Sequence, residues 1–518
     1  MKTAYFINPP SGLYRRDDRC QSRVEDQTVN VVFPPMELAL YAAVARRAGW
    51  SAQVRDYPAM GASWEDCRRE LQSARPDALL INTTSATAAA DIEAARALKS
   101  VHPGALTLAR GEYLRYDAAR ILTVEADLDL ICWGEVEAVL PDLLKLTEPG
   151  KEPRREWSAI PGVAFRMRAG ATRDPDARAT QGGALTNVFI SSERPIVKDL
   201  DALPLPARDL LDHRLYLSPE TGNPISVISA NRGCPSHCIF CPAGALSNYR
   251  VRFRSPVAIV DELRECVERH GIREFLFNGD TFTIKKSWLI ELCRGICDAG
   301  LDIRWGCNSR VDTMDDERAQ WLRRAGCWVV AFGVESGSQQ LLDRMGKSSR
   351  VERAFEAVAA VRRAGLAAHT FFIVGLPWET RQTLAETFDM VRRLDPDFFD
   401  FNVAYPLPGT ELWEIARRDG LFEGSAPSES SYARAALRSY ELSGAELTQW
   451  RRRALLRLYL RPRYILRTLR AAARSPRVLR NYVRAAVRRL RSLVHADGGA
   501  GASMPRTAVI RSEKQNGF

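Results

Sequence analysis

Two stretches of the chain alternate short apolar runs with segments whose apolar residues recur at helical spacing. In the first stretch, apolar runs predict strands at residues 4–7, 78–81, 106–108 and 128–132. Helical spacing predicts helices at residues 36–48, 86–101 and 136–146. Such alternation predicts a doubly wound parallel sheet, whose ligands bind beyond the carboxyl ends of the strands.

The second stretch alternates more regularly. Strands are predicted at residues 225–230, 274–277, 303–307, 328–332, 369–374 and 398–403, and helices at 256–270, 288–299, 352–364 and 381–394. A full eight-unit (β/α) barrel typically needs ~250 residues, and these six units span only about 180. We therefore predict a partial six-unit barrel with its chemistry at the carboxyl ends of the strands.

The predicted organisation is an α/β chain of five parts. They are a doubly wound domain (1–146), a connector with a small hairpin at 162–170 (147–224), the partial barrel (225–410), a helical region (411–494) and a disordered tail (495–518).

Composition sets the class of protein. Hydrophobic residues make up 46% of the chain and charged residues 26%, which excludes a wholly disordered or fibrous chain. No run of ~18 apolar residues and no signal peptide occurs, so a cytoplasmic location is predicted. The eleven cysteines of a cytoplasmic chain are not a disulfide framework.

Positive charge is concentrated near the C-terminus. Residues 451–494 hold fifteen Arg and no Lys, Asp or Glu, which leaves 59 of the 74 basic residues against 63 acidic ones elsewhere. These arginines alternate with Leu, Tyr and Ile. The pattern fits helices in a membrane interface, where each basic residue near an anionic surface contributes about 1 kcal/mol. It equally fits helices packed on the barrel with Arg in solvent, and RNA binding is a weaker third interpretation.

Three cysteines lie within eight residues, directly after the first predicted barrel strand. Cys234, Cys238 and Cys241 follow the spacing C-x3-C-x2-C in a loop, residues 231–242, that we name the Cys loop. Thiolates are preferred ligands of iron–sulfur clusters, and a [4Fe–4S] cluster usually takes four cysteines. Three from one loop leave one iron open to a small molecule. On spacing alone, a Cys3His zinc site with His237 and the absence of any metal remain alternatives.

The Cys loop and the predicted barrel together resemble the radical S-adenosylmethionine (SAM) superfamily. The resemblance rests on the cysteine spacing, with the aromatic Phe240 before the last cysteine, after strand one of a six-unit barrel. It implies that the three cysteines hold a [4Fe–4S] cluster whose open iron is chelated by SAM. An electron from the cluster would cleave SAM to a 5′-deoxyadenosyl radical, and the barrel would shield that radical from water.

The resemblance also implies SAM contacts where the next strands end. Besides Phe240, it assigns Asn278 and Asp280 to the amino group, Arg310 to the carboxylate, Glu335 as an acidic contact, and Gly375 and Pro377 to the adenine side. Taken singly, such residues are more often turns or helix caps, and their shared place after predicted strands favours a site. Trp378 departs from the family, which usually has Gly after this Pro.

The doubly wound domain ahead of the barrel resembles that of the cobalamin-binding radical SAM enzymes. Their domain typically has a Gly-Gly turn and then Gly-Glu-Gly-Glu, where this chain has Arg110-Gly111 and Gly134-Glu135-Val136-Glu137. No Asp-x-His-x-x-Gly occurs to offer a lower cobalt ligand, as is usual in this subfamily. The residues assigned to cobalamin are Thr83, Thr84, Ser85, Gly111, Gly134, Glu135 and Glu137. A domain that has lost its ligand is the alternative.

The resemblance implies an enzyme that transfers a methyl group to an unactivated carbon of a small molecule, such as a lipid, a tetrapyrrole or a secondary metabolite. Cobalamin would carry the methyl group, and the SAM-derived radical would activate the substrate. Cyclisation or oxidation, as in anaerobic tetrapyrrole ring closure, is the alternative within the family. A non-catalytic cobalamin-binding regulator is the alternative outside it, against which the complete cysteine triad argues. Flavodoxin or ferredoxin is the expected electron donor, and nucleic acid is not an expected partner because no RNA-binding module is visible.

Overall fold

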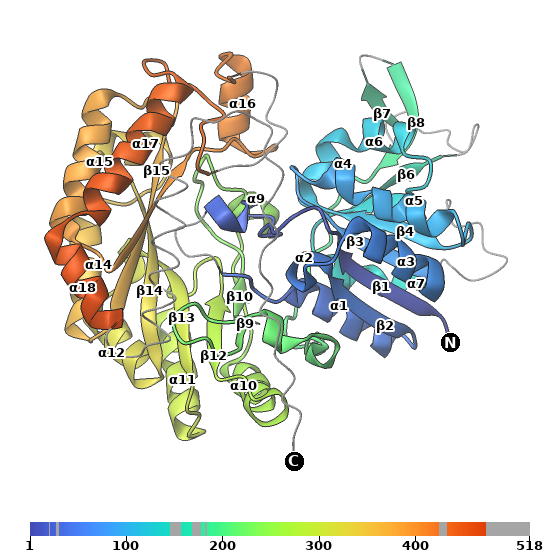
Figure 1. Cartoon of the computed structure of the whole chain (residues 1–518), viewed down its shortest axis with the longest axis horizontal. Helices are drawn as coiled ribbons and strands as arrows, with labels where there is room; N and C mark the ends of the chain where they lie inside the picture. Colours follow the sequence, from blue (N-terminus) through green and yellow to red (C-terminus); the bar gives the residue numbers. More distant parts are fainter. Residues whose placement is uncertain are drawn as a thin grey trace, which may run out of the picture.

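The structure, a computed structural model, describes residues 1–19, 21–26, 31–145, 157–167, 178–181, 184–423 and 432–472. Figure 1 shows two α/β bodies side by side, an N-terminal body built on one sheet and a barrel body built on another. The chain crosses from the first body to the second through an extended stretch with prolines at positions 204 and 206.

The N-terminal body is an eight-stranded sheet in the order β2-β1-β3-β4-β5-β6-β8-β7. Five strands are parallel, and they are β1 (Thr3–Asn8), β2 (Ser51–Asp56), β3 (Ala78–Asn82), β4 (Leu106–Arg110) and β5 (Leu130–Cys132). Its helices are α1 (Met36–Arg47), α2 (Tyr57–Met60), α3 (Trp64–Ala74), α4 (Ala88–Asp91), α5 (Glu93–Lys99), α6 (Ala118–Val124) and α7 (Leu140–Lys145). Two separate buried clusters cover the two faces of the sheet, so the prediction of a doubly wound sheet is confirmed.

The predicted connector contributes strands to the N-terminal sheet. Strand β6 (Val163–Arg166) pairs antiparallel with β5 and with β8 (Ala184–Ile190), and β8 pairs with β7 (Arg178–Gln181). The described part of the predicted hairpin, strand β6, therefore extends the N-terminal sheet, and residues 168–170 of that hairpin lie outside the described residues. The physical reason is that β5, three residues long, would otherwise be an uncovered sheet edge.

The barrel body has six parallel strands in the order β16-β15-β14-β13-β12-β9, which confirms the predicted partial barrel. Its strands are β9 (Ile225–Ser229), β12 (Glu274–Asn278), β13 (Arg304–Arg310), β14 (Cys327–Glu335), β15 (Ala367–Val374) and β16 (Phe398–Val403). Its helices are α9 (Ala243–Leu246), α10 (Pro256–His270), α11 (Lys286–Asp298), α12 (Asp316–Arg324), α13 (Gln339–Arg344), α14 (Val351–Arg363), α15 (Arg381–Leu394) and α16 (Glu411–Arg418). The short strands β10 (Asn231–Arg232) and β11 (Arg252–Phe253) pair beside the Cys loop.

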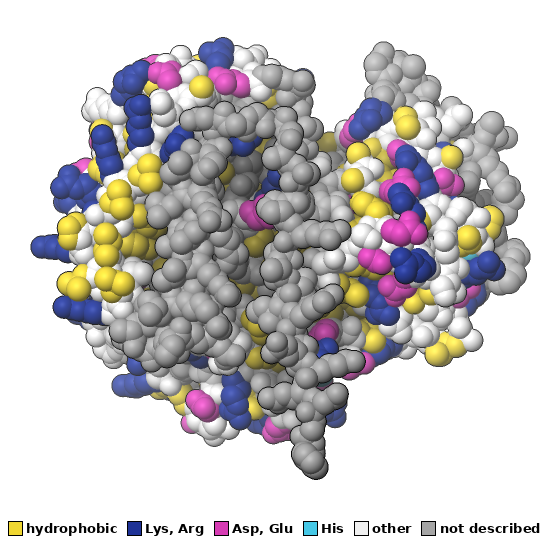
Figure 2. Space-filling view, in the orientation of Figure 1, with side chains coloured by type: hydrophobic (Ala, Val, Ile, Leu, Met, Phe, Trp, Pro, Cys, Tyr) yellow, Lys and Arg dark blue, Asp and Glu magenta, His cyan; other side chains and the backbone are white. Residues whose placement is uncertain are grey.

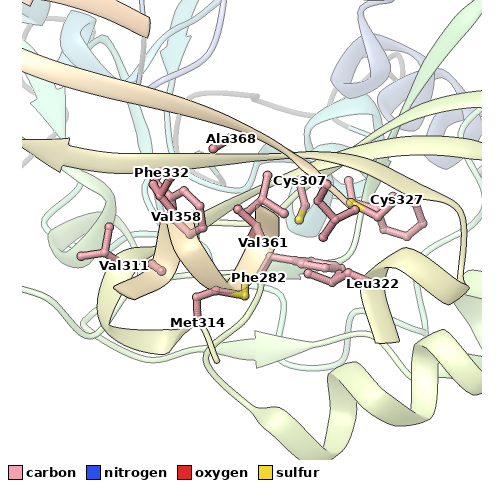
Figure 3. Close-up of a cluster of buried hydrophobic side chains, with 14 of the residues drawn as sticks. Phe282, Cys307, Val311, Met314, Leu322, Cys327, Phe332, Val358, Val361 and Ala368 are labelled. Atoms are coloured by element: carbon pink, nitrogen blue, oxygen red, sulfur yellow. The ribbon is translucent and has the colours of Figure 1, made fainter. Parts of the chain in front are cut away.

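Local sequence explains how the helices are placed outside the barrel. Helix α10 begins at Pro256, with the side chain of Ser255 accepting from the backbone of Ala258, and it ends at Gly271, whose φ is +66°. Its buried residues recur every three or four positions and contribute to the main core. Figure 3 shows part of this core, where Phe332 lies beside Val358 and Cys307 lies beside Cys327. Buried apolar side chains thus stabilise the packing of the strands, and the carboxyl ends of the strands can carry polar groups.

The described part of the Arg-rich region, residues 451–472, contains one packed helix and one largely exposed helix. Helix α17 (Gly444–Tyr459) packs on β16, with Leu455 and Leu458 fully buried and Arg451 donating to the backbone oxygen of Phe401 at 2.5 Å. The next helix, α18 (Pro462–Ala472), exposes apolar side chains, namely Ile465, Leu466 and Leu469. Figure 2 shows hydrophobic side chains among Lys and Arg on this flank of the barrel. The predicted helices beyond residue 472 and the predicted disordered tail lie outside the described residues.

Among the described residues, no helix is both long enough and apolar enough to cross a bilayer.

Candidate active site

The Cys loop follows β9 and is fixed by backbone contacts. Gly233 has a φ of +98°, and a Cβ there would lie 1.9 Å from the backbone oxygen of Arg250, so only glycine fits. The backbone N–H of Gly233 donates to Asp280 Oδ2 at 2.6 Å, and that of Cys234 donates to Ser247 Oγ at 3.2 Å. The loop is therefore held by β12 on one side and by α9 on the other.

The three cysteines of the Cys loop lie at one end of a cavity inside the barrel. The cavity has a volume of about 520 Å³ and is lined by Cys234, Cys238 and Cys241. Burial raises the pKa of Cys238, although the charges of Lys347 and Arg310 oppose the shift, and burial raises the pKa of Cys241 to about 12. Cys238 and Cys241 are therefore protonated without a metal, and metal binding must release their protons.

The geometry favours a cluster over a single zinc ion. Within the described part of the chain, no three His, Cys, Asp or Glu side chains converge closely enough to hold one metal ion. His237 is exposed and stacks on Tyr249, with ring centroids 4.0 Å apart. A cubane spreads its cysteine ligands over separate irons, so three free thiols at one cavity end fit a [4Fe–4S] cluster.

Two of the predicted SAM residues lie where β12 ends, and a residue of the other domain reaches them. Asn278 and Asp280 both accept hydrogen bonds from the guanidinium of Arg19, with 2.8 Å between Arg19 Nη2 and Asn278 Oδ1. Asp280 also lines the barrel cavity beside the cysteines. Arg19 was not predicted at this site, because it precedes Asp280 by 261 residues.

The structure adds a lysine to the predicted residues Arg310 and Glu335. Glu335 is buried, has an unusual φ of +73°, and accepts from Lys347 Nζ at 2.8 Å. Arg310 donates to Ser236 Oγ in the Cys loop at 3.1 Å and to the backbone oxygen of Lys347 at 2.8 Å. Lys347 lies in the loop between α13 and α14, away from any strand end, so the sequence analysis missed it.

The remaining predicted SAM residues lie at the side of this site. Phe240 lines the barrel cavity and packs near Ile373, whereas Gly375 and Pro377 are not among the residues that line it. Gly375 has a φ of +86°, and its N–H donates to Glu379 Oε2 at 3.1 Å. Burial raises the pKa of Glu379 to about 7, although this hydrogen bond opposes the shift. Glu379 therefore fixes the turn that carries Gly375.

The residues predicted for cobalamin lie together where β3, β4 and β5 end. We name residues 82–85, 110–112 and 134–137 the strand-end face. Residues 11–19 and 21, from the loop after β1, lie across much of it. Arg16 donates to the backbone oxygen of Asn82 at 2.5 Å, Gln21 accepts from the Ser85 N–H at 2.7 Å, and Asp18 pairs with Arg110 at 2.6 Å. This face is thus in contact with the chain's own first loop.

The glycines and carboxylates of the strand-end face are in close contact with other residues. A Cβ on Gly111 would lie 2.6 Å from Thr83 Oγ1, and one on Gly134 would lie 2.9 Å from the Arg194 side chain. Thr84 bonds to Thr87 at 2.8 Å. The two predicted carboxylates pair with barrel arginines, Glu135 with Arg252 at 2.7 Å and Glu137 with Arg232. These ion pairs join the two domains.

A second cavity of about 220 Å³ lies between the strand-end face and the Cys loop. Several buried polar atoms that line it have no hydrogen-bond partner among the described residues, and they are Arg110 Nε, Arg252 Nε, Asn231 Oδ1 and Asn231 Nδ2. Unpartnered buried polar atoms cost free energy, so they fit a polar ligand at this place. These polar atoms suit cobalamin, but the cavity of about 220 Å³ is too small for a corrinoid, because even drug-sized ligands occupy about 300–1,000 Å³. Asp17, Asp18 and Arg19 are among the residues that line it.

Comparison with known proteins gives the same architecture. Residues 228–391 match the Radical SAM superfamily. An uncharacterized methyltransferase of Pyrococcus horikoshii is 26% identical over 443 residues, which cover 86% of this chain and 91% of that protein. The anaerobic magnesium-protoporphyrin IX monomethyl ester cyclase of Cereibacter sphaeroides is 29% identical over 399 residues, 74% of this chain and 60% of that protein.

A solved structure shares both bodies. The radical SAM methyltransferase TsrM from Kitasatospora setae, solved with cobalamin and a [4Fe-4S] cluster bound, aligns with a TM-score of 0.62. The two chains are 18% identical, and the alignment covers 87% of this chain and 85% of that one. Residues 228–391 are therefore a domain of the radical SAM type, and they contain the cysteine loop. The chain as a whole shares its two-body fold with TsrM.

Proposed function

We propose that the protein is a cobalamin-dependent radical SAM methyltransferase that acts on an unactivated carbon of a small molecule. The observation that carries this proposal is the barrel cavity, where three free thiols of one loop lie with Asp280, Arg310 and Glu335. The relative from P. horikoshii supports methyl transfer, because the alignment with this named methyltransferase covers 86% of the chain.

When bound, the cluster supplies an electron to SAM, and cobalamin supplies the methyl group. The chain's own residues have distinct parts in this chemistry. Cys234, Cys238 and Cys241 hold the cluster after losing their protons. Asn278 and Asp280 accept from the SAM amino group, Arg310 donates to its carboxylate, Glu335 is a further acidic contact, and Phe240, Gly375 and Pro377 lie on the adenine side. The wall of the partial barrel limits the access of water to the cavity, which protects reactive species.

The strand-end face is the proposed cobalamin contact. Three of its predicted residues, Gly134, Glu135 and Glu137, line the cavity between the domains. Thr83, Thr84, Ser85 and Gly111, at the ends of β3 and β4, complete the proposed contact. Its place fits the requirement that a methyl donor and the radical site approach the same substrate atom. The cavity of about 220 Å³ lies between this face and the Cys loop, which supports that arrangement.

The substrate is proposed to bind in the barrel, away from the cysteines. Part of the wall there is apolar, with Trp328, Phe371 and Phe398 from three adjacent strands. A polar pair also lines this cavity. It consists of His369 and Asp400, whose Nε2 and Oδ2 atoms are 2.8 Å apart. This wall suits a mostly apolar substrate with a hydrogen-bonding group.

A second candidate is cyclisation or oxidation of a tetrapyrrole-like substrate. It is favoured by the 29% identity to the magnesium-protoporphyrin cyclase, whose shared region covers 74% of this chain. The cysteines and SAM residues would be used in the same way, and no methyl group would reach the product.

Isotope transfer separates these two candidates. We expect anaerobic turnover of the reconstituted enzyme with methyl-deuterated SAM and a cell extract to give a product three mass units heavier, read by mass spectrometry. A control with the three cysteines replaced by alanine should give no labelled product. Formation of 5′-deoxyadenosine with no label in any product would contradict methyl transfer and favour cyclisation.

The electron donor is proposed to be a small redox protein such as flavodoxin or ferredoxin, and the enzyme is proposed to lie in the cytoplasm. Contact with the inner face of the membrane is also proposed, through residues 451–494. The supporting observation is α18, which exposes Ile465, Leu466 and Leu469 between arginines. Such a helix inserts its apolar side below the lipid headgroups, while Arg binds anionic lipid.

A flotation assay tests the membrane contact. We expect the full chain to float with vesicles of anionic phospholipid and not with neutral ones. A variant that ends at residue 472 and carries Glu at positions 465, 466 and 469 should remain at the bottom, because it lacks the apolar face and seven of the fifteen arginines. It retains α17, whose buried Leu455 and Leu458 the barrel needs. Equal flotation of both proteins would exclude this contact.

A further inference from the structure

The loop after β1 places an arginine of the N-terminal domain on the barrel. The guanidinium of Arg19 pairs with Asp280 and donates to Asn278 Oδ1 at 2.8 Å. These two side chains are the proposed acceptors for the amino group of SAM. Both an arginine guanidinium and a SAM ammonium are cationic hydrogen-bond donors. One cation therefore already occupies the acceptors that the other would use.

We propose that Arg19 competes with the amino group of SAM: its guanidinium holds Asn278 and Asp280 until the ammonium of SAM replaces it. The inference rests on the proposed function, because it requires SAM to bind at these two residues. It adds to the SAM site a residue that the N-terminal domain supplies. It also makes SAM binding break a contact between the two domains.

The exchange leaves no charge without a partner. Asp17 accepts from Arg19 Nε at 3.0 Å and from Nη2 at 2.8 Å, so Arg19 keeps a carboxylate when it leaves the barrel. Burial pushes the pKa of Asp17 upward, but the charge and hydrogen bonds of Arg19 outweigh it and leave the pKa well below its usual range. Asp17 is therefore ionised. An unpaired buried charge costs free energy, so exchange of one cation for another costs less than loss of the Arg19 contact alone.

Asp280 is prepared for this exchange. Its Oδ2 accepts from the Gly233 N–H at 2.6 Å, next to Cys234, while Oδ1 faces Arg19. The carboxylate therefore stays anchored to the Cys loop when Arg19 leaves, and the freed oxygen faces the place where SAM would meet the cluster.

The same segment also contacts the strand-end face. Asp18, next to Arg19, pairs with Arg110 at 2.6 Å, and Arg110 lines the cavity between the domains. Withdrawal of Arg19 from the barrel thus displaces the segment that also covers the proposed cobalamin face. Asp17, Asp18 and Arg19 thus couple SAM binding in the barrel to the opening of the strand-end face.

The test measures SAM binding rather than turnover. Equilibrium dialysis with labelled SAM compares the reconstituted wild-type protein with R19M, and R19K serves as the matched control that keeps the cation. We expect R19M to bind SAM about tenfold more tightly, the scale of one charge-assisted hydrogen bond, and R19K to resemble the wild type. The second probe is 5′-methylthioadenosine, which lacks the amino-acid end of SAM, and its affinity should be the same in all three proteins.

Each other result overturns the proposal. Equal or weaker SAM binding by R19M would show that Arg19 does not compete, and an equal change for 5′-methylthioadenosine would show a general effect on the fold. If R19M fails to fold, D17N/R19M removes both charges and gives the same measurement. A wild-type protein that holds its cluster and binds no SAM would instead contradict the proposed function, which separates the two failures.

Discussion

Replacement of Cys234, Cys238 and Cys241 together by alanine is expected to abolish both the iron–sulfur cluster and SAM cleavage. The three thiols lie at one end of the barrel cavity, and they supply all the protein ligands that the Cys loop offers. Loss of groups that only support a metal ligand costs about 10–100-fold in affinity or activity, so loss of the ligands themselves should cost more. Iron and sulfide content, Mössbauer spectra of anaerobically reconstituted protein and the yield of 5′-deoxyadenosine measure the effect.

The chain offers a matched control. Cys297 on α11 is an exposed thiol outside the cavity, and C297A should keep the wild-type spectrum and activity. The triple variant should remain folded, because the loop is also held by the Gly233–Asp280 and Cys234–Ser247 hydrogen bonds, which use backbone N–H groups. A cubane spectrum that survives the triple replacement would contradict the whole assignment of the site.

The barrel could be predicted from the sequence because its signals are local. Helices at 256–270 and 381–394 and the strand at 398–403 match the structure residue for residue. Helix α10 has a capping Ser255, a Pro at its first position and Gly271 beyond its end, which together fix both limits. By contrast, the strand β2 was missed, because its apolar residues are only Ala52 and Val54, too few to form an apolar run.

Contacts between distant segments could not be predicted in this way. The sequence placed Asp280 and Glu335 at strand ends, but not the cations that reach them, Arg19 and Lys347. Neither cation lies in a periodic element, so no local pattern points to its partner. The same holds for Glu135 and Glu137, whose pairing with arginines of the barrel depends on how the two domains meet. The site was therefore predictable in its cysteines and strand ends, and not in the charges that complete it.

The charge of Lys347 is expected to set the electron affinity of the cluster and the binding of SAM. Lys347 is buried, pairs with Glu335 at 2.8 Å, and opposes the burial-raised pKa of Cys238. Reduction adds negative charge to the cluster, and a nearby buried cation stabilises that charge. K347M should therefore make the midpoint potential more negative by about 60 mV, equivalent to a tenfold change in the one-electron equilibrium. Its affinity for SAM should fall, because Glu335 loses the partner that orients it.

Three variants separate this electrostatic effect from a structural one. K347M alone leaves Glu335 buried without a cation, which costs about 3–5 kcal/mol in stability. The double variant E335Q/K347M removes both charges and should regain most of that stability. Its midpoint potential should remain more negative than that of the wild type. K347R keeps the cation and should have the midpoint potential of the wild type. Electrochemical titration followed by electron paramagnetic resonance would measure these potentials. An unchanged potential in the folded double variant would show that Lys347 serves only to pair Glu335.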